Sequence, residues 1–317
     1  MTTAFVFDNE TVLCRHTVTG WWPLQVTLPK TEATAAYQVG RVTLLESLAS
    51  RHWEDTCDTA ETEDFAATFA ITLEHAQTQD IAIPDLNIAA STSRSVADTA
   101  DGSSDVNEQQ RIEFVSYRQL ITQLPAALAA QLSQAAQLLR WQADTQFCSR
   151  CSAPVSADSS GERAMVCSVC HLRQYPRVQP CIITAITRPN PKTGEMQILL
   201  AHHHRYGKPS SALQYGLIAG FVEVGESLEH AVVREVAEEV AIRLTDIRYI
   251  SSQPWPFPSN LMLGFRAAYA SGDIAIQQKE LSHADFFDIS NLPKIPFKGS
   301  IAYELIAQIV HEQGMSL

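Results

Sequence analysis

Three glutamates recur at helical spacing in the second half of the chain. Glu235, Glu238 and Glu239 stand at positions i, i+3 and i+4, so a helix would project their carboxylates from one side. Neighbouring negative charges repel unless they face water or are neutralised by hard divalent cations. Because such acids are common on exposed helices, the spacing alone favours a solvated face, and a Mg²⁺ or Mn²⁺ site is the alternative.

Four cysteines form two C-x-x-C pairs, Cys148 with Cys151 and Cys167 with Cys170, separated by 15 residues. This spacing is typical of a structural Zn²⁺ site with four thiolate ligands. Four protein ligands leave no open position for water, so the predicted role is in folding rather than catalysis. Redox dithiols or free core cysteines are the alternative, but neither pair has the strand-then-helix setting of a redox motif.

The other residues of metal-binding type lack such a pattern. Cys14, Cys57 and Cys181 are predicted to be buried thiols, because seven cysteines in a reducing compartment argue against a disulfide framework. The run His202 to His204 follows an apolar strand. Because adjacent histidines cannot all face one ion, we expect a solvated loop there rather than a metal site.

The elements that must position these residues follow from apolar periodicity. Residues 1–147 mix short apolar runs with acids and contain a polar, low-complexity segment at 89–106, which predicts a long loop or disordered insertion. The predicted helices cover residues 124–139, 227–240 and 301–313, and the predicted strands cover 181–187, 196–201, 247–251 and 261–270.

Length and composition predict a globular protein of two or three domains, with 317 residues, 45% hydrophobic and 18% charged. Residues 1–147 carry 19 acidic and 8 basic side chains, which disfavours binding of a nucleic-acid backbone by this part. The chain starts without a basic flank before an apolar run, and it lacks an apolar stretch of membrane-spanning length. A cytoplasmic location is therefore expected.

The glutamate helix lies in a longer pattern. Five residues separate Gly220 from Glu226, seven separate Glu226 from Arg234, and the three glutamates and Ile242 complete a 23-residue segment. This segment resembles the Nudix box of the Nudix hydrolases. It departs at Ala241, where the family has Gly; in a left-handed conformation Ala costs roughly 1 kcal/mol relative to Gly.

Other segments resemble the NADH pyrophosphatase branch of that family. The run Ser252 to Asn260, S-Q-P-W-P-F-P-S-N, is similar to the branch signature S-Q-P-W-P-F-P-x-S, with Asn260 in place of the closing Ser. Tyr175 begins a Y-P-R-x-x-P segment, and Gly299 begins a G-S-I-A segment, both of which match the branch. The cysteine pairs also precede the box as the branch's zinc ribbon does, with serines at 149 and 152 instead of the usual glycines.

The resemblance implies an architecture. We expect an α+β protein with a Nudix α/β/α sandwich and mixed sheet at 176–317, a zinc ribbon at 148–175 and an α+β N-terminal domain at 1–147. It also implies a homodimer. Arg234 is expected to pair with Glu226 and brace the loop before the helix.

The resemblance also implies ligands for catalytic Mg²⁺ or Mn²⁺. These are Glu235, Glu238, Glu239 and Glu280, with the carbonyl of Ala219. The first three are the implied catalytic residues, and Glu239 is expected to matter most, as a ligand and as a base for the attacking water.

An implied substrate site accompanies these ligands. Phe221 and Tyr175 would stack on the nicotinamide, because a flat, electron-poor ring is best held between aromatic faces. The remaining implied substrate-binding residues are Gln253, Pro254, Trp255, Pro256, Phe257, Pro258, Ser259, Asn260, Ala302 and Arg118.

The implied activity is metal-dependent hydrolysis of the pyrophosphate bond of NAD(H) to NMN(H) and AMP, with removal of NAD caps from RNA 5′ ends as a further activity. No DNA or membrane partner is expected. One alternative is a Nudix hydrolase of ADP-ribose or another nucleoside diphosphate conjugate. The other is a non-catalytic nucleotide-binding regulator, which retention of all four glutamates disfavours.

Overall fold

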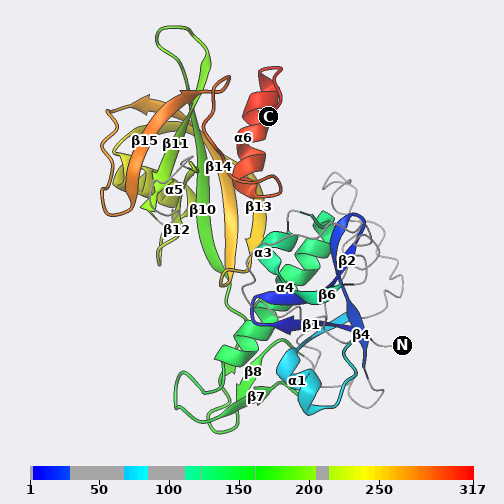
Figure 1. Cartoon of the computed structure of the whole chain (residues 1–317). Coiled ribbons are helices and arrows are strands. Elements are labelled where there is room, and N and C mark those ends of the chain that lie inside the picture. Colours follow the sequence, from blue (N-terminus) through cyan, green and yellow to red (C-terminus); the bar gives the residue numbers. More distant parts are fainter. Residues whose placement is uncertain (1–2, 29–67, 85–110, 122, 161, 205–213) are drawn as a thin grey trace, which may run out of the picture. The chain divides into compact units, whose positions relative to one another are not determined.

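The computed structural model describes residues 3–28, 68–84, 111–121, 123–160, 162–204 and 214–317. The chain divides into two compact units, Met1–Arg177 and Val178–Leu317 (Figure 1). The division into 1–147, 148–175 and 176–317 stays a prediction. Cys57 and the low-complexity segment 89–106 lie outside the described residues.

A mixed sheet forms the centre of the first unit. Its strands are β1 (Thr3–Asp8), β2 (Thr11–Thr17), β3 (Gly20–Pro23), β4 (Gln25–Thr27), β5 (Thr68–Thr72) and β6 (Ile112–Ser116). The strand β1 pairs antiparallel with β2 and β4 and parallel with β5. Its apolar run from Ala4 to Phe7 is buried throughout, which is the pattern of a strand covered on both faces.

Helices α1 (Leu73–Thr78), α3 (Tyr117–Leu120) and α4 (Ala126–Asp144) complete this part of the unit. The helix predicted at 124–139 is confirmed and extends five residues further, to Asp144. Leu132, Ala135 and Leu138 are buried along one side of α4, as helical periodicity requires. The buried Tyr117 hydroxyl donates to the Ala129 carbonyl oxygen at 2.7 Å, which ties α3 to α4.

The cysteine-rich segment ends the first unit with a small three-stranded sheet. Its strands are β7 (Val155–Ala157), β8 (Met165–Cys167) and β9 (Arg173–Gln174), in the order β7-β8-β9. Ser152 adopts φ 61° and His171 adopts φ 57°, so each C-x-x-C turn is followed by a residue in the left-handed region. Glycine adopts this conformation without strain, which explains why the related zinc ribbons carry it at position 152.

The second unit is built on a mixed sheet, as the resemblance implied. Its strands are β10 (Gln179–Pro189), β11 (Met196–His203), β12 (Ile218–Phe221), β13 (Arg243–Trp255), β14 (Asn260–Ser271) and β15 (Leu281–Asp288). The order is β13-β14-β10-β11-β15, with β12 paired to β10. Strands β10 and β14 run parallel, whereas the other pairs are antiparallel.

Two helices cover opposite faces of this sheet (Figure 1). Helix α5 (Leu228–Val240) packs on the face that includes Ile182, and α6 (Ile301–Glu312) packs on the face that includes Ile183. Successive strand residues point to opposite faces, so the continuous apolar run of β10 supplies both cores. Fully burying each such side chain contributes about 1.5–3 kcal/mol. The predicted α/β/α sandwich is confirmed.

The proline-rich segment is partly a strand and not only a loop. Strand β13 runs on to Trp255, beyond the predicted end at 251, and the turn to β14 spans residues 256–259. Pro254 lacks an N–H group, but β13 is the edge strand of the sheet, where a missing donor breaks no ladder bond. The edge position therefore explains how the strand accommodates Pro254.

The prediction of a solvated loop at His202 to His204 is wrong for its first two residues. Strand β11 continues through His203 because it pairs with β15 there, His202 opposite His283. His202 and His203 are 2% and 3% exposed, whereas His204 is exposed. The prediction that Cys14 and Cys181 are buried is confirmed, and burial raises the pKa of Cys14 to about 12.

Capping residues fix the ends of α5. The Ser227 side chain accepts from the His230 N–H at the N-terminus, and Ala241 at the C-terminus adopts φ 60° and ψ 20°. Its N–H donates to the Ala237 carbonyl at 3.1 Å. The chain thus holds an alanine in the left-handed conformation at the place where the family has glycine.

The substitution Ala241→Gly is expected to stabilise the second unit by roughly 1 kcal/mol, because it removes the left-handed strain. Urea unfolding followed by circular dichroism measures the change. Ala237→Gly is the matched control: it places glycine at an exposed position inside the same helix and should destabilise by about 1 kcal/mol. If both substitutions destabilise the protein, Ala241 is not strained in its left-handed conformation.

Candidate active site

Arg234 joins the loop, the helix and the strand around the glutamate cluster. Its Nε and Nη2 donate to the two oxygens of Glu226, at 2.8 and 2.9 Å. Its Nη1 donates to Glu235 at 2.9 Å and to Glu238 at 3.0 Å, and Nη2 also donates to the Phe221 carbonyl at 2.8 Å. All five guanidinium N–H groups are therefore engaged. The predicted pairing with Glu226 is confirmed.

These contacts set the charge states of the cluster. The hydrogen bond from Arg234 lowers the pKa of Glu226 to about 2, and the N–H of Glu223, 3.0 Å from a carboxylate oxygen, acts in the same direction. The same carboxylate raises the pKa of Arg234. Burial raises the pKa of Glu235, against the opposing effect of Arg234. Arg234 thus holds charged carboxylates together that would otherwise repel.

The glutamates differ in burial. The Glu239 side chain is 2% exposed and that of Glu235 is 13% exposed, whereas that of Glu238 is 52% exposed. Glu280, just before β15, is also exposed. The solvated-face interpretation therefore describes Glu238 but is wrong for Glu239, because α5 turns that residue toward the sheet.

Gly220 in β12 makes room for Glu235. A β-carbon at residue 220 would lie 2.0 to 2.3 Å from the Glu235 carboxylate atoms, closer than any non-bonded contact allows. The carboxylate therefore fills the space that a side chain at 220 would need. Ala219, whose carbonyl is a candidate ligand, precedes this glycine in the same strand.

The residues present fit a hard divalent cation. Mg²⁺ and Mn²⁺ prefer oxygen ligands, and carboxylates on one helix beside a strand carbonyl supply them. The Glu235 carboxylate lies directly over Gly220, so it is next to the backbone of β12. Among the described residues, the four cysteines are the group of possible metal ligands whose ligand atoms all lie within 4.8 Å of one another. The carboxylate oxygens of the glutamates are neighbours but as a group lie further apart than that.

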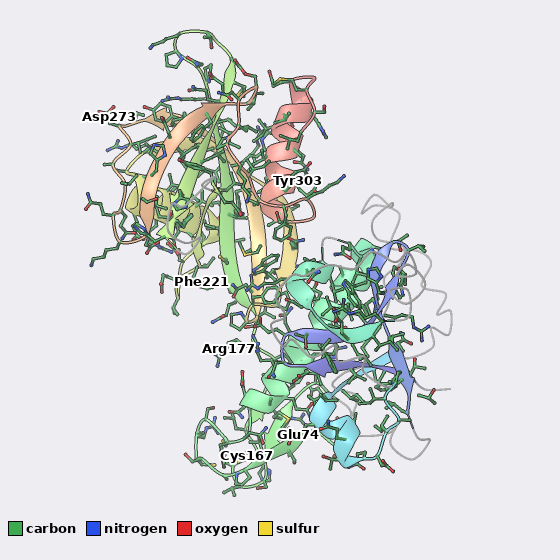
Figure 2. All side chains as sticks on the ribbon, viewed as in Figure 1. Glu74, Cys167, Arg177, Phe221, Asp273 and Tyr303 are labelled. Carbon is green, nitrogen blue, oxygen red and sulfur yellow. The ribbon has the colours of Figure 1, made fainter. Side chains whose placement is uncertain are left out.

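The second unit that carries the glutamates also has partly exposed aromatic side chains. Phe221 is 49% exposed and lies at the end of β12 (Figure 2). Trp255 meets Phe257 edge-on at 5.3 Å and stacks on Phe297 at 6.4 Å. These rings offer apolar surface of the kind that binds flat heterocycles. Pro254 and Pro258 are exposed, whereas Pro256 is buried and Ser259 is half-buried.

Other candidate substrate residues also make contacts within the protein, and their role in substrate binding stays a prediction. The Gln253 amide donates to the Gly299 carbonyl and accepts from the Ile301 N–H, both at 2.8 Å, so it fixes the start of α6. Ala302 is buried in the core beneath that helix. Asn260 is buried, and its amide donates to the Phe257 carbonyl at 3.4 Å across the β13–β14 turn.

The four cysteines form a metal-binding cluster in the first unit. Sulfur atoms of Cys148 and Cys170, and of Cys151 and Cys167, lie 3.5 Å apart. Four ligands at about 2.3 Å around one ion lie about 3.8 Å from one another, so these sulfurs need to move little to enclose it. N–H groups of Cys170 and Val169 point at the Cys167 sulfur, and they help lower its pKa to about 6. Figure 2 shows Cys167 in this segment.

Tyr175 and Arg118 belong to the first unit. Tyr175 is 55% exposed, and its hydroxyl donates to Glu162 at 3.1 Å; this bond raises the pKa of Tyr175. Arg118 lies in α3 and is exposed. Both therefore come from a different unit than the glutamates.

The sequence reading missed one residue at the glutamate cluster. His203 Nε2 lies 4.0 Å from the Glu239 carboxylate, and both side chains are buried. The signal was strand alternation: in an apolar strand that continues, two adjacent histidines point to opposite faces. Treating the three histidines as a single loop concealed this difference.

Sequence comparisons relate this chain to known proteins. The profile of the NUDIX domain matches residues 182–309. The chain is similar to the NAD-capped RNA hydrolase NudC of Klebsiella pneumoniae strain 342, with 44% identity over 207 residues that cover 65% of this chain and 75% of the relative. The NAD-capped RNA hydrolase NudC of Salmonella paratyphi C strain RKS4594 gives the same identity and coverage.

Among solved structures, a NUDIX hydrolase from Nitrosomonas europaea is 22% identical, covers 54% of this chain and 94% of its own, and has a TM-score of 0.43. No helix among the described residues is long and apolar enough to cross a membrane.

Gly220→Ala is expected to weaken Mn²⁺ binding by about 10-fold or more, because the new β-carbon must displace the Glu235 carboxylate. Isothermal titration calorimetry measures the affinity. Gly194→Ala is the control: alanine is strained there by a φ of 76°, but nothing lies within 4 Å of its β-carbon, so it should leave Mn²⁺ binding unchanged. Equal affinity of both variants and the natural chain would show that Glu235 need not lie over residue 220.

Proposed function

The chain belongs to the Nudix hydrolases, in the branch of the NAD-capped RNA hydrolases, and we propose that it hydrolyses the pyrophosphate bond of NAD(H). The products are NMN(H) and AMP. One observation carries the proposal: identity of 44% to such a hydrolase over 207 residues, 75% of that relative's length. The intact cluster of glutamates on α5, held by Arg234, supports catalysis rather than binding alone.

The glutamates give the second unit its chemistry. Glu235, Glu238, Glu239 and Glu280, with the Ala219 carbonyl, are proposed to hold Mg²⁺ or Mn²⁺. When bound, the cation neutralises charge on the diphosphate and activates the attacking water. Glu239 is the proposed base, as the resemblance to the family implies.

The apolar rings bind and orient the nicotinamide end in this proposal. Phe221 is the candidate stacking surface in the second unit because it is half exposed and its carbonyl accepts from Arg234. Trp255 and Phe257 supply a second apolar surface on the β13–β14 hairpin. Tyr175 and Arg118 remain proposed contributions of the first unit.

Removal of NAD caps from RNA is the second proposed activity. It is supported by the printed names of the two relatives, both NAD-capped RNA hydrolases. The scissile bond is the same pyrophosphate, so the same glutamates serve both substrates. RNA would have to follow the second unit, because residues 1–147 carry 19 acidic and only 8 basic side chains.

The finer features of the assembly belong to the same proposal. Zn²⁺ is the proposed occupant of the four-cysteine cluster, because tetrahedral thiolate sites favour it. A homodimer is proposed from the resemblance, and a cytoplasmic location is proposed from the sequence pattern. No DNA partner is proposed.

Glu239→Gln is expected to lower hydrolysis of NADH by about 100-fold or more, because it removes a charged ligand and the proposed base. The assay separates NMNH and AMP by chromatography in the presence of Mg²⁺ or Mn²⁺. Glu229→Gln is a matched control: it is an exposed acid on the same helix and should retain activity. Full activity of Glu239→Gln would refute the assignment.

The same assay separates the alternative substrates. NADH, NAD⁺, ADP-ribose and NAD-capped RNA are compared at equal concentration. A higher kcat/KM for ADP-ribose than for NADH would favour the alternative, a Nudix hydrolase of ADP-ribose or another nucleoside diphosphate conjugate. Binding of NADH without turnover of any of these substrates would favour the regulator.

One Zn²⁺ per chain is expected from elemental analysis of the purified protein. Cys167→Ser should lower this content and expose the 148–174 segment to proteases, because metal binding supplies folding free energy to such small sites. Cys181→Ser is the control, because Cys181 is buried in β10 and lies outside the cluster. Unchanged zinc content in Cys167→Ser would contradict the site.

A further inference from the structure

Three consecutive histidines join the end of β11 to the segment that carries Glu280. We name His202, His203 and His204 the histidine brace. His202 Nδ1 lies 2.6 Å from the Ser282 hydroxyl. His204 Nε2 lies 3.0 Å from the Gln278 carbonyl oxygen, and the His204 N–H donates to the Glu280 carbonyl at 3.0 Å. The brace therefore contacts residues on both sides of Glu280 and the backbone of Glu280 itself.

The middle residue of the brace faces the other direction. His203 Nε2 lies 4.0 Å from the Glu239 carboxylate, with both side chains almost fully buried. This distance is too long for a hydrogen bond, so these two atoms are close polar neighbours that share no hydrogen bond.

Glu239 needs such a neighbour because a buried carboxylate is costly unless polar groups surround it. The five N–H groups of Arg234 are engaged by Glu226, Glu235, Glu238 and Phe221. Arg234 therefore positions two of the glutamates on α5, and His203 is the basic side chain seen beside the third. The cluster is held from two sides.

A backbone contact closes the arrangement. The N–H of Gln277 donates to the Glu239 carbonyl at 2.9 Å, and the N–H of Ala275 donates to the Val240 carbonyl at 3.1 Å. Backbone hydrogen bonds thus connect the 275–280 segment to the end of α5, which carries Glu239, and to His204 after β11.

We propose that the histidine brace sets the positions of Glu239 and Glu280 for the divalent cation, with His203 as the positioning residue of the Glu239 carboxylate. This inference rests on the proposed function, because it concerns the same cation site. Residues that orient metal ligands commonly change metal affinity by about 10- to 100-fold when they are replaced. The brace should have an effect of that size although it is no ligand.

The test is Mn²⁺ titration of the zinc-loaded full chain by calorimetry, with free Mn²⁺ followed by electron paramagnetic resonance. His203→Phe keeps a planar ring but removes the nitrogens, and its Mn²⁺ Kd should rise by about 10- to 100-fold. His203→Gln keeps a polar side chain beside the Glu239 carboxylate and should restore most of the affinity. His311→Ala, an exposed histidine on α6, is the control and should bind Mn²⁺ normally.

Coupling distinguishes positioning from general damage. In a Glu239→Gln background, His203→Phe should cause little further loss of Mn²⁺ affinity, because its effect passes through that carboxylate. Excess Mn²⁺ should also restore kcat of His203→Phe for NADH. Equal losses in both backgrounds, or an unchanged Kd in His203→Phe, would overturn the proposal.

His204→Ala keeps the test decisive if His203→Phe does not fold, because His204 is exposed. Its Kd should rise several-fold through Glu280, and an unchanged Kd would overturn the brace. If the natural chain binds Mn²⁺ and hydrolyses NADH while the brace variants match it, only the brace fails. If the natural chain neither binds Mn²⁺ at this cluster nor hydrolyses NADH, the proposed function fails with it.

Discussion

The guanidinium of Arg234 is the contact on which the second unit's site depends. Like charges concentrated on one side of a helix would repel, and burial of Glu235 adds to the cost of its charge. Arg234 offsets both effects, since it contacts Glu226, Glu235 and Glu238 together with a carbonyl of β12. The loop, the helix and the strand that form the site are therefore joined at one side chain.

Close packing between α5 and β12 sets the remaining geometry. Gly220 allows the Glu235 carboxylate to lie against the strand backbone. Helix α5 turns Glu239 toward the sheet, where the Nε2 atom of His203 lies 4.0 Å from the Glu239 carboxylate. The same helix leaves Glu238 exposed. One helix thus places three chemically identical side chains in three environments, which is how a single fold obtains distinct roles from one residue type.

Much of this arrangement could be predicted from the sequence. Helix α5 and the pairing of Arg234 with Glu226 follow from spacing and from the family pattern, and the cysteine spacing predicted the cluster. Predictions failed where tertiary pairing decides. Strand β13 extends through Pro254 because it is an edge strand, and β11 extends through His203 because β15 pairs with it. Sheet position and strand pairing join residues that are distant in sequence, so local periodicity cannot predict them.

The engaged state of Arg234 has a thermodynamic consequence for ion uptake. A cation that approaches the cluster meets carboxylates that already have a cationic partner, because Arg234 shares its single positive charge among Glu226, Glu235 and Glu238. The free energy of loading is therefore a difference between two ionic arrangements, smaller than the attraction of four bare carboxylates would give. The affinity of the site for a cation thus depends on how far Arg234 keeps or releases its carboxylate partners.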